Sequence, residues 1–155
     1  MISNERVSAP KDKDFVVFLI GARVNNWFNF RALKAIGSAM PRMLNELYAQ
    51  PESGFLGGES WFGRTTIMVQ YWESFEKLEA FASDRTKTHY PAWVDYYKNA
   101  QKYKNAVGIW HETYVVKPGQ YESIYANMPA FGLGKVFGNS PLTAAGSTSA
   151  KRMKQ

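Results

Sequence analysis

The stretch Ala106–Val116 reads AVGIWHETYVV and sets a single histidine, His111, inside a β-branched and aromatic run. These residue types favour a strand, and a strand that is apolar almost from end to end is expected to be buried. An ionisable imidazole at its centre must find a partner or take part in chemistry. Because side chains alternate along a strand, one face is predicted to carry Val107, Ile109, His111, Thr113 and Val115.

The segments before this strand predict further strands and a helix. Phe15–Val24 (FVVFLIGARV) has the composition of a buried strand. From Phe28 to Tyr48 the apolar residues recur at steps of three and four, which is typical of an amphipathic helix. Pro41 lies inside this helix, where we expect it to kink or divide it. Phe55–Phe62 and Thr65–Trp72 are predicted to be two strands of a hairpin that turns at Gly63-Arg64.

Two more helical stretches complete the order of elements. Ser74 is expected to cap a second amphipathic helix, and a third helical stretch runs from Tyr90 to Lys104. After the Ala106–Val116 strand, Tyr121–Ala126 is predicted to be a short strand, and Gly132–Lys135 a flexible rim. The order strand, helix, strand, strand, helix, strand is that of the split βαβ, ferredoxin-like α+β fold.

A four-stranded sheet with helices on one face leaves its other face uncovered. The predicted strands are apolar on both faces, so the second face also needs a cover. A second copy of the chain is the simplest cover. We therefore expect a homodimer, assembled as a dimeric α+β barrel.

Composition limits the protein to a few classes. The 155 residues favour one domain, and 45% hydrophobic with 15% aromatic residues suit a large apolar core. Cysteine is absent, which excludes disulfides, thiolate metal sites and a cysteine nucleophile. No apolar run is long enough to span a membrane and no signal peptide is recognisable, so we expect a cytoplasmic protein. The net charge of +6 comes from scattered residues without a nucleic-acid motif, so no nucleic-acid partner is expected.

The chain is predicted to have three parts. Residues 1–13 are polar and read as a flexible lead. Residues 14–138 form the folded domain. Residues 139–155 are rich in Ser, Thr, Gly and Ala and end in basic residues, which predicts a disordered or loosely docked tail.

Several residues are candidates for chemistry, each with a structural alternative. His111 is a candidate general base, an orienting donor or an axial haem ligand, or else a core histidine bonded to its neighbours. Alternation places Glu59 on the same face as Phe55, and both Glu59 and Gln70 are unusual in a plain core strand. Each lies in a pocket or at an exposed edge. Arg64 either anchors an acidic substrate or is a solvated residue of the turn.

Three blocks of sequence resemble a known family. They are WFGRTTIMVQYW (Trp61–Trp72), GIWHETYVV (Gly108–Val116) and YESIYANMPAFGLGK (Tyr121–Lys135). The family comprises small bacterial and fungal proteins, once called a domain of unknown function and later grouped with the monooxygenase-like protein of fumagillin biosynthesis. The resemblance covers residues 14–138. It implies a dimeric α+β barrel similar to the antibiotic-biosynthesis monooxygenases, which oxidise polyketide or aromatic substrates with dioxygen, often without metal or flavin.

From this resemblance we expect a cofactor-independent monooxygenase of secondary metabolism, without a metal. Its substrate would be an apolar polyketide, terpene or aromatic metabolite bound in a barrel cavity. The predicted catalytic residues are His111, Asn127, Glu59 and Arg64. The predicted substrate contacts are Trp61, Met68, Gln70, Trp110, Tyr114, Met128 and Phe131.

A weaker resemblance favours a different cofactor. The Trp-His-Glu run with the later Tyr-Glu and Asn is similar to the haem-dependent aldoxime dehydratases, which share the barrel fold. It implies haem b with His111 as axial ligand. Those enzymes carry a second, acid–base histidine where this chain has Met128-Pro129, which argues against dehydratase chemistry and leaves haem binding open. A haem-binding dehydratase or oxygenase and a non-catalytic dimeric binder of hydrophobic molecules remain the alternatives.

Overall fold

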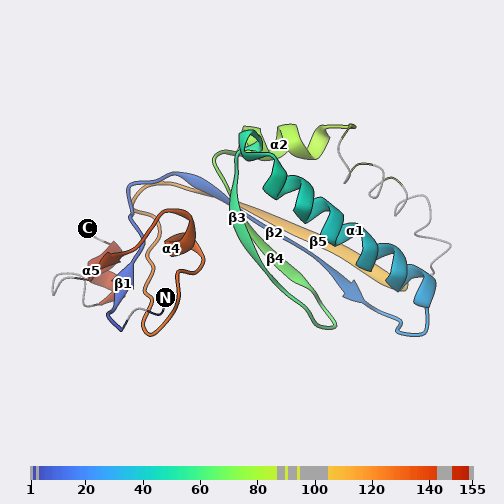
Figure 1. Cartoon of the computed structure of the whole chain (residues 1–155), viewed down its shortest axis with the longest axis horizontal. Coiled ribbons are helices and arrows are strands. Elements are labelled where there is room, and N and C mark those ends of the chain that lie inside the picture. The colour runs from blue at the N-terminus through green and yellow to red at the C-terminus, as the bar shows by residue number, and fades with distance from the viewer. Residues whose placement is uncertain are drawn as a thin grey trace.

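The computed structural model describes residues 2, 4–86, 90, 94, 105–142 and 148–153, and for residues 35–43 it describes the backbone alone. Its central sheet is antiparallel, with the strand order β3-β4-β2-β5. Two helices lie on one face of this sheet, as Figure 1 shows. The strands are β2 (Phe15–Val24), β3 (Phe55–Trp61), β4 (Ile67–Trp72) and β5 (Val107–Val116), and the helices are α1 (Phe30–Ala49) and α2 (Phe75–Ser83).

This topology confirms the predicted ferredoxin-like α+β fold. Along the chain the order is β2, α1, β3, β4, α2, β5, with a short 3-10 helix η1 (Pro51–Ser53) after α1. The first and third strands of the motif, β2 and β4, lie in the middle, and β3 and β5 form the two edges. Both central strands therefore have hydrogen-bonded neighbours on each side, whereas each edge strand has one side without a neighbour within the sheet.

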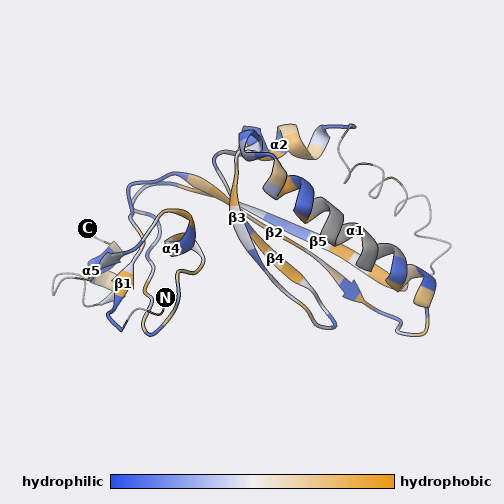
Figure 2. Cartoon of the chain, in the orientation of Figure 1, coloured by the Kyte–Doolittle hydropathy of each residue, from blue (hydrophilic) through white to orange (hydrophobic). Residues whose placement is uncertain are grey.

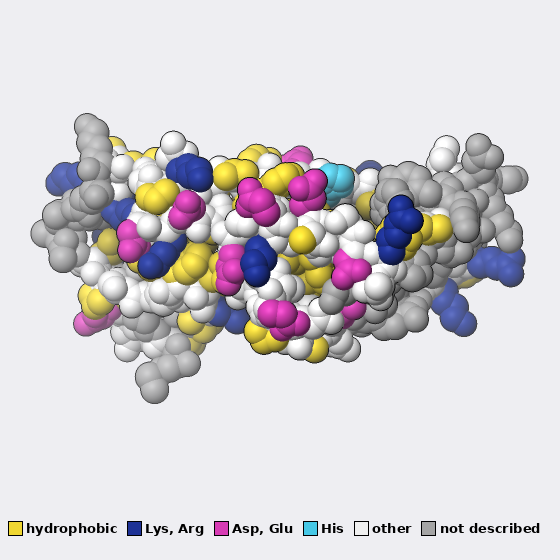
Figure 3. All heavy atoms as spheres, turned by 90° about the horizontal axis from the view of Figure 1, so that it is seen from above, with side chains coloured by type: hydrophobic (Ala, Val, Ile, Leu, Met, Phe, Trp, Pro, Cys, Tyr) yellow, Lys and Arg dark blue, Asp and Glu magenta, His cyan; other side chains and the backbone are white. Residues whose placement is uncertain are grey.

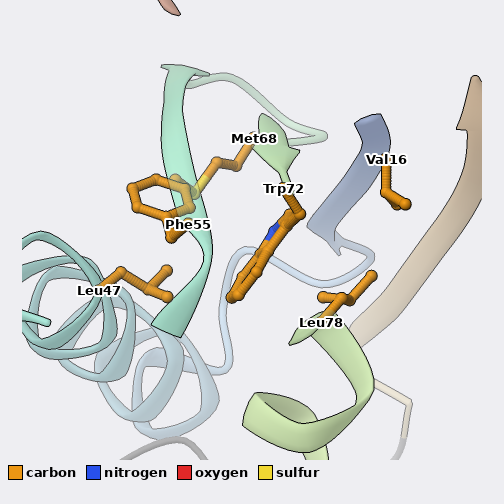
Figure 4. Packing of buried hydrophobic residues seen from close by; sticks show 6 residues of the cluster. All are labelled: Val16, Leu47, Phe55, Met68, Trp72 and Leu78. Atoms are coloured by element: carbon orange, nitrogen blue, oxygen red, sulfur yellow. The ribbon is translucent and has the colours of Figure 1, made fainter. Parts of the chain in front are cut away.

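The main core lies between the helices and the sheet. Trp72 of β4 is 1% exposed, and its ring contacts those of Phe55 and Phe81 at centroid distances of 5.5 and 5.4 Å. Figure 4 shows how side chains from three strands and both helices meet there. The buried cluster consists of Val16, Leu47, Phe55, Met68, Trp72 and Leu78. Burial of such large apolar side chains is the main favourable contribution to folding.

The helices agree with the sequence patterns except at Pro41. Helix α1 runs from Phe30 to Ala49 without division at this proline. Ala32 before the proline and Leu47 after it are both buried, so packing on one face accounts for a single helix. Ser74 caps α2 as predicted, because its hydroxyl accepts a hydrogen bond from the Lys77 N–H at 3.2 Å. The helix expected over 90–104 lies largely outside the described residues.

A bulge in β3 corrects one predicted face. The register shifts between Phe55 and Gly57, so that Phe55 lies opposite Trp72 and Glu59 lies opposite Val69. An extra residue in one strand reverses the alternation beyond it. Phe55 therefore packs beneath the helices, whereas Glu59 and Trp61 point to the other face. The prediction that Phe55 and Glu59 share a face was wrong.

The described parts of both chain ends pack together in a small module beside the sheet (Figure 1). Strand β1 (Val7–Ser8) pairs with β6 (Ser140–Pro141), and Val7 also bridges to Tyr125. The short helices α4 (Leu133–Val136) and α5 (Ser149–Met153) complete the module. We expected a flexible lead and a loosely docked tail, but Val7 is 7% and Arg152 only 3% exposed. Apart from the bridge at Tyr125, residues 121–126 form no strand.

Arg152 attaches α5 to the rest of the module. Its guanidinium donates to a carboxylate oxygen of Glu122 at 2.6 Å and to the Ser149 hydroxyl at 2.9 Å. The hydrogen bond from Arg152 holds the pKa of the Glu122 carboxyl below its usual value. Short terminal sequences with few apolar residues give little sign of such an ion pair, because it joins positions thirty residues apart.

Replacing Arg152 is expected to destabilise the protein in a pH-dependent way. For Arg152→Met we expect a loss of about 1–3 kcal/mol in the free energy of unfolding at neutral pH, because Glu122 loses a charged donor. The pKa of Glu122 is lowered in the folded state, so the ion pair stabilises above the unfolded pKa and its contribution is lost as the pH falls through the folded pKa. Urea unfolding at neutral and at acid pH, followed by tryptophan fluorescence, measures the free energy of unfolding under both conditions. Met153→Ala is the control, and an equal loss at neutral and acid pH would contradict the prediction.

Candidate functional site

The register of the sheet assigns each strand residue to one of two faces. The helix-side face carries Val16, Phe18 and Ile20 of β2, because Val16 belongs to the cluster beneath the helices. The open face carries the residues between them, including Val17 and Leu19. Antiparallel partners share a face, so the residue pairs of the three ladders assign the residues of all four strands to a face.

His111 lies on the helix-side face, in line with Ile20 and Met68 of the neighbouring strands. The four other residues of β5 that were predicted to share its face do so. Contrary to our expectation, the imidazole is exposed, and Figure 3 shows a histidine at the surface seen from above. Ile109 and Val115 on the same face are 41% and 56% exposed. The buried cluster that includes Ala32 of α1 reaches β5 only at Val107, and β5 is an edge strand.

The surroundings of His111 are apolar. The ring of Phe18 lies 5.7 Å from the imidazole, measured between centroids. On its own strand the neighbours on this face are Ile109 and Thr113. The helix-side face of β5 is therefore a mainly apolar stripe, exposed from Ile109 to Val115, with one acid–base group at its centre.

Gln70 and Met68 lie deeper on the same face and contact each other. The Gln70 side-chain carbonyl accepts a hydrogen bond from Trp72 Nε1 at 2.9 Å, and its amide donates to the Met68 sulfur at 3.3 Å. Both residues are buried. The unusual amide thus satisfies the Trp72 indole within the core, and contact of Gln70 or Met68 with a substrate stays a prediction.

The open face carries a second set of predicted residues. Glu59 and Trp61 of β3 lie at one side of this face, and Trp110 and Tyr114 of β5 lie at the other. The Tyr114 hydroxyl donates to Glu112 at 2.6 Å, and this hydrogen bond raises the pKa of the phenol. Leu19 and its neighbours form an apolar floor between the two strands.

Trp110 has a polar atom without a partner. Its Nε1 is buried and makes no hydrogen bond within the described part of the chain. The indole lies close over Gly21, where an added Cβ would be 2.8 Å from this nitrogen. A buried N–H that lacks an acceptor is rare in native proteins, and it leaves one donor available on the open face.

Residues 121–137 cross one end of the open face. The ring of Phe131 packs edge-on against Trp61 at 6.1 Å, and Lys135 Nζ lies 2.9 Å from a Glu59 carboxylate oxygen. That ion pair raises the pKa of Lys135. Asn127 and Met128 belong to the same segment but are exposed. Among the predicted residues, the structure thus brings Glu59, Trp61 and Phe131 together.

Two tyrosines that sequence reasoning missed converge beside this group. A Cβ on Gly132 would lie 3.2 Å from the Tyr71 hydroxyl and 3.5 Å from that of Tyr125, which accepts a hydrogen bond from the Gly134 N–H at 3.2 Å. Burial raises the pKa of Tyr71, with smaller contributions from Tyr125 and Glu59. The sequence feature that could have indicated this contact is the Gly-Leu-Gly run, which we interpreted as a flexible rim. Its first glycine, Gly132, lets the backbone approach the hydroxyls of Tyr71 and Tyr125.

The predicted catalytic set does not form one site within a single chain. His111 is on the helix-side face, and Glu59 is on the open face, with the sheet between them. Arg64 lies in the β3–β4 turn, where its Nε donates to the Val24 carbonyl at 3.2 Å. Asn127 is exposed and has a φ of 54°. The roles assigned to these four residues stay predictions.

Comparison with known proteins places the chain in a family. The family model described as Monooxygenase af470-like matches residues 15–133. The chain belongs to this family. The Monooxygenase af470 of Aspergillus fumigatus is 30% identical, over 81% of this chain and 47% of that protein, so the chain spans about half the length of this curated relative.

A solved structure supports the fold of this monooxygenase-like family member. The crystal structure of an aldoxime dehydratase (OxdRE) in complex with butyraldoxime superposes with a TM-score of 0.61 and 16% sequence identity. The match covers 81% of this chain and 38% of that chain. At this identity the likeness shows the fold alone.

Gly132 allows a direct test of the tyrosine arrangement. For Gly132→Ala we expect a loss of about 1–3 kcal/mol in the free energy of unfolding, because a side chain is strained at this positive φ and also crowds the Tyr71 hydroxyl. Gly63→Ala is the matched control, since a Cβ there meets nothing closer than 3.8 Å. Chemical unfolding measures the free energy of unfolding of both variants. Equal values for the two would refute the close approach.

Proposed function

We propose that the protein is a cofactor-independent monooxygenase that acts on an apolar polyketide, terpene or aromatic metabolite of secondary metabolism. Membership of the Monooxygenase af470-like family supports the reaction class. The observation that carries the proposal is His111, an accessible imidazole and the one ionisable side chain among the β5 residues of the helix-side face. An apolar substrate would lie on Ile109 and Phe18, with its reactive carbon at the imidazole.

The proposed chemistry needs one base and an apolar surface. His111 would accept a proton from a carbon or phenol of the substrate, and the resulting anion would supply electrons to dioxygen. For a CH₂ group, one oxygen atom enters the substrate as a carbonyl, and the other leaves as water with the two displaced hydrogens. Atoms and electrons balance without a further reductant. The protein would supply the base and an apolar surface that orients the substrate.

We also propose that a second copy of the chain covers the open face. This face combines an apolar floor with Trp61 and Tyr114, which are 45% and 50% exposed. Large exposed aromatic side chains on a sheet face are typical of an interface. In such a homodimer, Glu59 and Trp110 would face the partner across an enclosed space, which is where a barrel cavity would form.

The homodimer predicts a change in mass when the open face is altered. We expect the wild-type chain to sediment as a dimer, and Tyr114→Glu to shift it toward the monomer by placing an additional carboxylate beside Glu112. Phe75→Glu is the control, because Phe75 is 44% exposed but lies on α2. Sedimentation velocity at several concentrations measures the distribution. A wild-type monomer throughout would contradict the proposed assembly.

A haem protein is the second candidate function, and the same histidine favours it. An accessible imidazole between Ile109 and Val115, with Phe18 nearby, is compatible with a flat macrocycle ligated through His111. Haem bound there would supply redox or Lewis-acid chemistry at its iron. The chain lacks a histidine at Met128-Pro129, so this candidate does not include the acid–base step of the dehydratases it resembles.

Replacing His111 tests the proposed reaction. For His111→Gln we expect turnover of an oxidisable substrate to fall by about 10²–10⁴-fold, the usual contribution of a general base. The assay is oxygen uptake together with product analysis on a panel of polycyclic phenols, polyketides and terpenes. Gln120→Ala, an exposed turn residue, is the control. Full activity in His111→Gln would exclude the assigned role.

The absorbance spectrum separates the two candidates. A colourless protein whose spectrum with added hemin is that of free hemin supports the cofactor-independent reaction. A sharp Soret band that disappears in His111→Gln would instead establish the haem protein. Binding of the panel compounds without any product under oxygen would favour a non-catalytic carrier.

A further inference from the structure

Two turns at one end of the sheet hold aromatic side chains in solvent. The β2–α1 turn and the start of α1 carry Trp27, Phe28 and Phe30, which are 53%, 87% and 74% exposed. The β3–β4 turn carries Phe62, which is 78% exposed. Both turns lie along the lower edge of the molecule in Figure 1. Such exposure of large rings is unusual, because leaving them in water forfeits the gain from burial.

Hydrogen bonds fix the first turn in place. The backbone N–H groups of Asn25 and Asn26 donate to the Ala106 carbonyl at 2.8 and 3.0 Å. The Asn26 side chain accepts from the Phe28 N–H at 2.9 Å, and that of Asn29 caps α1 through the Ala32 N–H at 3.1 Å. The backbone that carries the three exposed rings is therefore held in place by hydrogen bonds.

The second turn is tied to the end of β2, directly before the first. The Val24 N–H donates to the Arg64 carbonyl at 2.8 Å, and Arg64 Nε donates back to the Val24 carbonyl at 3.2 Å. Arg23 adds a hydrogen bond to the Thr65 hydroxyl at 2.9 Å. These contacts place Phe62 on the same edge as the first three aromatic residues.

Basic residues accompany the aromatic rings. Residues 23–34 and 61–66 contain four cationic side chains and no Asp or Glu. All four are exposed, and Figure 2 shows hydrophilic and hydrophobic positions next to one another at the start of α1. We call this surface the aromatic–basic edge, composed of Arg23, Trp27, Phe28, Phe30, Arg31, Lys34, Phe62 and Arg64.

We propose that the aromatic–basic edge docks the protein on an anionic lipid membrane. Aromatic side chains partition into the boundary between headgroups and acyl chains, and adjacent Arg and Lys side chains attract acidic headgroups. Aromatic and cationic side chains lie together at this edge, on turns that are held by hydrogen bonds. No helix of the described residues is long and apolar enough to cross a membrane, so the association is peripheral.

Charge complementarity favours an anionic membrane over a second copy of the chain or a nucleic acid as the binding partner of this edge. A second copy of the chain would present the same cationic edge, and two such edges repel each other. A nucleic acid would pair with the arginines but would not require three phenylalanines and a tryptophan at the tips of two turns. An anionic bilayer satisfies both the charges and the rings.

Vesicle binding tests the proposal. We expect the chain to co-sediment with phosphatidylcholine vesicles that contain phosphatidylserine, and to bind more weakly when salt is raised or phosphatidylserine is omitted. The double variant Phe28→Ser/Phe62→Ser is expected to lose about tenfold or more in partition coefficient. Arg31→Glu/Lys34→Glu is expected to lose at least about fivefold per charge. Carboxylates at the start of a helix are compatible with its dipole, so this variant should fold.

Controls keep the result specific to the edge. Phe75→Ser removes a ring that is 44% exposed on α2 and should bind as wild type. Circular dichroism and urea unfolding of each variant establish that it is folded. Wild type that stays in the supernatant with phosphatidylserine vesicles would overturn the proposal, as would binding that both double variants leave unchanged. Dissociation of a dimer by Phe28→Ser/Phe62→Ser, without any vesicle binding of wild type, would assign the edge to a second copy instead.

Discussion

The structure depends on β2, the central strand that pairs with β4 on one side and with the edge strand β5 on the other. It pairs with β4 through five residues and with β5 through ten. Alternation along it sends Val16, Phe18 and Ile20 under the helices and sends Val17 and Leu19 to the open face. Every other element takes its place relative to this division. The core, the stripe that carries His111 and the apolar floor of the open face all follow from which residue of β2 each residue of the other strands is aligned with.

This division governs how chemistry can be arranged in the molecule. A side chain on one face of a sheet cannot reach a substrate on the other, since the backbone and two layers of side chains lie between. His111 and the Glu59–Lys135 pair therefore belong to different environments, one accessible from the helix side and one beneath residues 121–137. A family that uses this fold can vary either environment without disturbing the other.

Local patterns in the sequence predicted most of the fold. Alternation on β4 and β5 assigned the correct faces to Met68, Gln70 and His111, and the element order indicated the ferredoxin-like topology. Alternation assigned Glu59 to the face of Phe55 wrongly, because the bulge in β3 adds one residue to the strand between them. It also failed where burial depends on distant segments. His111 is exposed although its strand is largely apolar, and the proximity of Tyr71 to Tyr125 joins residues far apart in the chain.

The pairing of β1 with β6 brings the two ends of the chain together in one small module. This pairing closes the chain into a loop that is held together at β1 and β6. Two residue pairs form the β1–β6 ladder, whereas ten join β2 to β5. A force applied between the two ends would therefore separate β1 from β6 before it separated β2 from β5. Residues 121–137 would then be drawn away from Tyr71 while the central strands stayed paired.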